Sequence, residues 1–150
     1  MNNYIKDFFK DVLRHTHGLG IFEMAKVRGT TELTEIETVD ADKTVIVKGQ
    51  SINPVADFAD ATVGLSRMGV LQGFLQYPGF ETDGATIEVV TQDRNGVDTP
   101  VEVKFKSEDN TDAHYRFMLA DVINQQLKDI TFKGAEYDIN ILPSVKAMKD

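Results

Sequence analysis

The pattern of apolar and polar positions along the chain changes its period several times and predicts an α+β fold. Between residues 3 and 16 the apolar side chains recur at helical spacing and form one broad stripe. Gly18 and Gly20 follow this helix as stop signals. A second helix is predicted over residues 67–77, with Ser66 as its expected N-cap. Its predicted buried side holds Val70, Leu71, Phe74 and Leu75.

Patterns typical of β-strands fill most of the remaining chain. A turn is expected at 28–30, an irregular stretch at 51–62 and a connector at 120–129. Asn95-Gly96, a dipeptide typical of hairpin turns, joins the first two strands of a predicted three-strand meander. The predicted strands span residues 21–27, 31–39, 43–49, 85–92, 99–106, 112–119, 130–133 and 136–142.

The end of the chain repeats features of its beginning. Ser144 is expected to be the N-cap of a further helix, and the chain ends about two turns into that helix pattern. A short lead-in followed by a helix with regularly spaced lysines therefore occurs at both ends, which predicts a repeated unit of β-α-βββ type. We expect a first domain over residues 1–122. Residues 123–150 are expected to form a connector and the start of a second, truncated domain.

The whole chain is acidic, whereas the predicted helices are mildly basic. Its 150 residues hold 16 Lys and Arg against 24 Asp and Glu, giving a net charge of −8. Residues 1–17, 66–77 and 144–150 each carry a net charge of +1, so the rest of the chain carries −11. The total argues against a simple nucleic-acid binder, because such proteins cluster many cations. The distribution instead favours the helices as the surfaces that would meet an anion.

Both predicted helices have features that favour the approach of a polyanion. At ~100° per residue, the cations of the first helix and His17 fall within an arc of about 80°, predicting a basic row on one solvated edge. The second helix has Gly69 and Gly73 in its interior, each costing about 1 kcal/mol relative to alanine. A helix surface without side chains would let the backbone of a polyanion come close. The basic row consists of Lys6, Lys10, Arg14 and His17.

Composition limits the chemistry further. Hydrophobic residues make up 41% and charged residues 27%, which is typical of a globular domain with its own core. The absence of cysteine excludes disulfides, thiol nucleophiles and thiolate metal sites. The sequence shows neither a signal peptide nor an apolar run long enough for a membrane span. We therefore expect a cytoplasmic protein without a membrane partner.

Two groups of residues are candidates for a catalytic or metal site. His15 and His17 point apart on a helix, and no carboxylate lies at matching spacing, so a solvated helix end is favoured over a metal site. An acidic cluster would suit paired carboxylates, but its members scatter over both faces of strands. We expect no catalytic residues, metal or cofactor. The cluster comprises Glu32, Glu35, Glu37, Asp40 and Asp42.

The succession of elements resembles the PCNA-like sliding clamps of T-even-type bacteriophages, which are ring-shaped processivity factors of DNA polymerases. The similarity is one of pattern and covers essentially the whole chain. It is closest over Val63 to Tyr77, a strand leading into a short apolar helix, and over Ala113 to Met148. It departs from the family at Met1 to Asn3, which barely provide the strand that opens a clamp unit.

The resemblance implies antiparallel sheets with two helices packed on one face and a function without catalysis. Such clamps are homo-oligomeric rings, acidic outside, that encircle double-stranded DNA independently of its sequence. A clamp loader places them, and they tether the replicative polymerase. By position, the DNA-facing residues would be Lys6, Lys10, Arg14, Arg67, Lys146 and Lys149. Polymerase and loader tails would dock beside the connector, near Val122, Ile123 and Leu127.

Two other function classes remain compatible with the sequence. The first is an acidic, β-rich protein-interaction module of a phage with no role on DNA, which would not bind a polyanion at any salt concentration. The second is a small-molecule enzyme that uses the acidic cluster. Changing Glu35 or Glu37 would then abolish ligand binding or activity.

Overall fold

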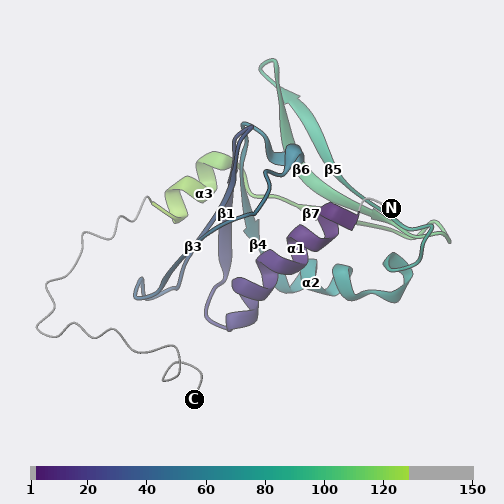
Figure 1. Ribbon diagram of the computed structural model, residues 1–150, viewed down its shortest axis with the longest axis horizontal. Coiled ribbons are helices and arrows are strands. Elements are labelled where there is room, and N and C mark those ends of the chain that lie inside the picture. The colour runs from purple at the N-terminus through teal and green to yellow at the C-terminus, as the bar shows by residue number, and fades with distance from the viewer. Residues whose placement is uncertain (1–2, 129–150) are drawn as a thin grey trace, which may run out of the picture.

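The computed structural model describes residues 3–128 and has an α+β architecture (Figure 1). Two antiparallel sheets and three α-helices make up this part of the chain, and no barrel closes within it. The helices are α1 (Asn3–His15), α2 (Met68–Gln76) and α3 (Ala120–Gln126). The strands are β1 (Met24–Gly29), β2 (Thr34–Val39), β3 (Ile46–Gln50), β4 (Thr62–Ser66), β5 (Thr86–Arg94), β6 (Val97–Lys106) and β7 (Asp112–Arg116).

The strands form one sheet in the order β3-β2-β1-β4 and another in the order β5-β6-β7. A single antiparallel bridge connects the two sheets. In this bridge the Gly64 amide donates to the Met118 carbonyl at 3.0 Å, and the Met118 amide donates back at 2.8 Å. Gly64 lies in β4 and Met118 just follows β7, so the chain passes from one sheet to the edge of the other at this point.

The main apolar core lies between α1, α2 and both sheets. The stripe predicted on α1 is buried, and it packs together with residues of α2, β1, β4, β6 and β7. Phe9 and Phe58 are fully buried, with ring centroids 6.0 Å apart, and Phe117 lies within 6.3 Å of both. These three aromatic rings join α1, the short 3-10 helix at Ala56–Phe58 and the end of β7. The core therefore fixes α1 against both sheets.

The hairpin signal at Asn95-Gly96 is confirmed. Asn95 has φ 56° and Gly96 has φ 82°, so both central residues adopt the left-handed conformation of a type I′ turn. The register runs from Arg94↔Val97 along the hairpin to Thr86↔Lys106, with a bulge between Val90 and Thr91. The end of this hairpin projects well beyond β7 (Figure 1).

Three local predictions are wrong. Ser66 belongs to β4, and the N-cap of α2 is Arg67, in a left-handed conformation with φ 51° and no side-chain cap. Val70 is 37% exposed, because the buried side of α2 is formed by Met68, Leu71 and Leu75. The turn expected at 28–30 begins later, because β1 continues through Gly29.

The segment predicted as a connector contains the helix α3, which packs on β4. Ile123 and Leu127 are buried with Val39, in an apolar cluster separate from the main core. The domain boundary expected between residues 122 and 123 falls within this helix. No helix within residues 3–128 combines the length and hydrophobicity needed to cross a bilayer. The strands predicted at 130–133 and 136–142, and the helix predicted from Ser144, lie outside the described residues.

We predict that Gly64→Ala destabilises the fold, because its new Cβ would lie 2.8 Å from the Cβ atoms of Ile123 and Met118. Overpacking of this kind costs about 1–3 kcal/mol. Urea denaturation should show this loss, and amide exchange in α3 should accelerate. Gly49→Ala is the matched control, since its Cβ would meet nothing within 4 Å. Equal stabilities of the two variants would contradict the close packing at Gly64.

Candidate nucleic-acid interface

Helices α1 and α2 lie side by side and together form one face of the molecule (Figure 1). Lys6, near the start of α1, contacts Phe80, which follows α2 in the chain. His17, just after α1, lies beside Gly69 at the start of α2. The two helices therefore run in opposite directions, and the cations of α1 lie along the side that faces α2.

Lys6 does not lie on the solvated edge that its spacing predicted. The residue is only 8% exposed, and its ammonium donates to the Phe80 carbonyl at 3.2 Å. The carboxylate of Glu81 lies 3.6 Å from the same ammonium. The helical phase of Lys6 is the one expected, but the segment after α2 covers it. Lys6 thus serves to hold α1 against that segment.

Lys10 reaches the same carboxylate from one turn further along α1. Its ammonium donates to Glu81 Oε1 at 3.2 Å, and both side chains remain about half exposed. The hydrogen bond from Lys10, with the charges of Lys6 and Lys10, holds the pKa of Glu81 below its usual value. Exposed pairs of this kind contribute little to stability. Glu81 nevertheless neutralises part of the positive charge on this face.

The remaining cations of the face are exposed. Arg14 has no hydrogen bond or ion pair with any residue in 3–128. His15 turns away from this row, and its Nδ1 lies 2.9 Å from the Asp11 carbonyl. Arg67 is also exposed and stands where β4 passes into α2. Lys10, Arg14 and Arg67 are therefore the accessible cations among the expected DNA-facing residues in this part of the chain.

The glycines of α2 leave its outer surface bare. Gly73 is exposed, and a Cβ built on it would meet nothing within 4 Å. A Cβ on Gly69 would lie 3.5 Å from His17 Nε2, an ordinary contact distance. Neither helix packing nor a positive φ explains these two residues. The helix stability that these glycines cost is compatible with a surface that another molecule approaches closely.

Glu81 belongs to this face although no pattern in the sequence predicts it. The residue follows Pro78-Gly79, where the helix pattern ends, and only the fold brings it beside α1. No local motif marks it, because its partners Lys6 and Lys10 are more than 70 positions away. Lys146 and Lys149, also predicted to face DNA, lie outside the described residues.

The three residues predicted to bind partner proteins are arranged differently from one another. Val122 is 41% exposed on α3, whereas Ile123 is fully buried and holds this helix on the sheet. Leu127 is buried but contributes to the wall of a hollow of about 380 Å³. This hollow also includes Met24, Val39 and the loop at 40–43. A hollow with both apolar and charged lining residues therefore lies beside α3, and only Leu127 of the three predicted residues lines it.

Several members of the acidic cluster make structural contacts. Asp40 accepts hydrogen bonds from the amides of Thr44 and Val45, both at 2.7 Å, and these bonds close the loop between β2 and β3. The bond from Val45 contributes most to holding the pKa of Asp40 below its usual value. Glu35 forms an ion pair with Arg28 at 2.7 Å. These contacts give the carboxylates a role in the sheet.

The sequence matches no model of a known protein family, and no curated protein sequence matches it. Within residues 3–128, no group of three or more His, Cys, Asp or Glu side chains is placed to hold a metal ion.

We predict that Gly73→Ala stabilises the protein. Alanine is favoured over glycine in a helix interior by about 1 kcal/mol, and the open space at Gly73 accepts a methyl group without a clash. The midpoint of urea denaturation should rise while the slope of the transition stays unchanged. A lower midpoint would show that the outer side of α2 is not open.

Proposed function

We propose that this chain belongs to a DNA sliding clamp, a processivity factor that encircles double-stranded DNA and tethers a replicative polymerase. The helices α1 and α2 would face the duplex, and the outer surface would remain acidic. This proposal includes the finer fold expectation, a clamp-type arrangement in which two helices cover one face of antiparallel sheets. Closure into a homo-oligomeric ring and placement by a clamp loader are parts of the same proposal.

One observation carries the proposal: α1 and α2 lie side by side, α1 carries the exposed cations Lys10 and Arg14, and Arg67 is exposed at the start of α2, in a chain of net charge −8. Phosphates would meet these cations without any requirement for a base sequence. The bare outer side of α2 at Gly69 and Gly73 supports a close approach of the nucleic-acid backbone. Lys10 and Arg14 belong to α1, whereas Arg67 lies at the start of α2, beside Tyr115 and Arg116.

The small number of accessible cations suits a protein that must move along DNA. Each phosphate contact adds a counterion-release contribution, so many contacts would bind tightly and hinder sliding. A ring that encloses the duplex does not need high affinity, because its topology prevents dissociation. Weak contacts at Lys10 and Arg14 would centre the duplex while leaving it free to move.

The hollow beside α3 is the proposed docking place for polymerase and loader tails. Its lining contains the apolar residues Met24, Val39 and Leu127 together with the charged residues Glu23, Asp40, Lys43 and Lys128. Pockets that combine an apolar wall with a few polar groups are typical binding sites for ligands and short peptides. Ile123 would support this site by fixing α3, and Val122 would contact the partner from the exposed side of the helix.

We expect the double variant Lys10→Glu/Arg14→Glu to lose binding to duplex DNA. Reversing both charges removes two phosphate contacts and adds repulsion, so affinity at low salt should fall about tenfold. Fluorescence anisotropy with a short labelled duplex measures this, and NMR titration of the wild type should shift amides of α1 and α2. Lys48→Glu/Lys106→Glu is the matched control, since both lysines lie on strands away from this face.

Two results would count against the proposal. Equal losses in the two double variants would indicate an unspecific response to net charge. The absence of binding by the wild-type chain at any salt concentration would favour a protein-interaction module without a role on DNA.

We further expect Glu81→Gln to strengthen DNA binding. The change frees the Lys10 ammonium from its carboxylate partner, while Lys6 keeps its bond to the Phe80 carbonyl. The slope of log K against log salt should become steeper by about 0.9, which corresponds to one additional phosphate contact. Glu88→Gln removes the same charge at an exposed position of β5 and should leave the slope unchanged. If both variants raise the affinity equally, the pairing of Glu81 with Lys10 has no specific effect.

A further inference from the structure

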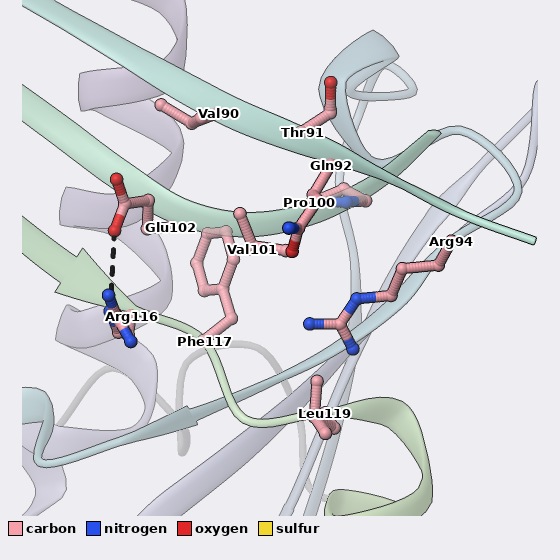
Figure 2. A pocket seen from close by; sticks show the side chains of 10 residues that line it. All are labelled: Val90, Thr91, Gln92, Arg94, Pro100, Val101, Glu102, Arg116, Phe117 and Leu119. Atoms are coloured by element: carbon pink, nitrogen blue, oxygen red, sulfur yellow. Dashed lines mark ion pairs between the residues drawn. The ribbon is translucent and has the colours of Figure 1, made fainter. Parts of the chain in front are cut away.

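A groove of about 580 Å³ opens where β7 separates from β6 (Figure 2). The last paired residues of these strands are Glu102 and Arg116, and one more hydrogen bond runs from the Phe117 amide to the Val101 carbonyl at 3.0 Å. The chain then crosses to the other sheet at Met118. Beyond this point the β5-β6 hairpin continues alone, so a notch remains between the hairpin and residues 117–119.

The notch has an apolar floor between two arginines. Val101, Phe117 and Leu119 line it, and Leu119 is 47% exposed. Figure 2 shows Arg94 extending from the hairpin toward the space above Leu119, with Arg116 on the other side of Phe117. Exposed apolar side chains combined with arginine are typical of protein interfaces.

The two arginines are available to a ligand. Arg94 has no hydrogen bond or ion pair with a residue in 3–128. Within residues 3–128, the one ion pair of Arg116 joins its Nε to Glu102 at 3.7 Å, and its side chain is 88% exposed. Glu102 is also held by His114 Nδ1 at 2.9 Å. The lining therefore carries a net positive charge in a chain whose total is −8.

We propose that this notch docks an extended acidic peptide segment of a partner protein. An apolar side chain of the peptide would cover Phe117 and Leu119, and its carboxylates would pair with Arg94 and Arg116. Arginine binds carboxylates through two parallel hydrogen bonds, which gives such a contact both strength and direction. This docking place is separate from the α1-α2 face and from the hollow beside α3, and it does not depend on the function proposed for them.

Charge complementarity favours this occupant over a nucleic acid. Glu102 lines the notch, and Asp93 and Asp98 lie on the same hairpin, so a continuous phosphate backbone would meet repeated repulsion. A peptide can place a few carboxylates at the arginines alone. Its extended backbone also suits the edge of β6 at Val97 to Thr99, which faces no further strand within residues 3–128.

The test uses a short fluorescein-labelled peptide that alternates Asp with Leu and Phe, together with its counterpart carrying Lys in place of Asp. We expect saturable binding of the acidic peptide only, with NMR shifts at Phe117 and Leu119. The double variant Arg94→Glu/Arg116→Glu should lose about tenfold or more in affinity, as expected for two charge-assisted contacts. Lys106→Glu, on the same hairpin but remote from the notch, should bind as the wild type does.

Three results would overturn the proposal: absence of saturable binding, equal binding of both peptides, or shifts confined to another surface. Sedimentation of the unliganded protein supplies a further test. A wild type that self-associates through this notch, and a double variant that does not, would assign the notch to a second copy of this chain. Circular dichroism of each variant verifies that a loss of binding does not reflect unfolding.

Discussion

The shared aromatic core is the constraint on which the remaining structure depends. Phe9, Phe58 and Phe117 come from a helix, a loop and the end of a strand, and they meet where both sheets approach α1. Burial of large aromatic side chains contributes strongly to stability, so these contacts determine where α1 lies. Because the helix is fixed on its apolar side, its polar side is oriented as well. The basic face is a consequence of the same packing that holds the sheets together.

Charge on this face is limited by the fold itself. Lys6 is used to attach α1 to the segment after α2, and Lys10 shares the carboxylate of Glu81. Helix α1 carries three cations, and Arg14 is the one of them without a hydrogen bond or ion pair to a residue in 3–128. A surface built in this way attracts a polyanion weakly. The proposed clamp requires such weak contact, whereas a protein that must remain at one site on DNA would need more free cations.

Local patterns in the sequence predicted those elements whose conformation is determined by neighbouring residues. The spacing of apolar residues predicted α1, and Asn95-Gly96 predicted the turn of the β5-β6 hairpin, because helical periodicity and a type I′ turn are properties of neighbouring residues. The sequence also correctly indicated antiparallel sheets combined with helices. These features were sufficient for the fold class.

Features that depend on distant contacts could not be predicted in the same way. The helix α3 has few apolar residues, and it is stabilised by the packing of Ile123 against the sheet. Lys6 and Lys10 occupy equivalent helical phases, yet only Lys6 is covered, because Phe80 and Glu81 lie over one turn of the helix. The spacing therefore predicted the helical phase of these cations but not which of them are free.

The contact between Lys6 and Phe80 has a consequence for synthesis on the ribosome. These residues are 74 positions apart, so α1 is synthesised well before its partner. At an elongation rate of roughly 5–20 residues per second, this interval is about 4–15 s. A helix of 13 residues is only marginally stable in isolation, and the apolar stripe of α1 remains uncovered during this time. Helix α1 is thus fixed only after the segment that follows α2 has been synthesised, and its apolar stripe is exposed on the nascent chain until then.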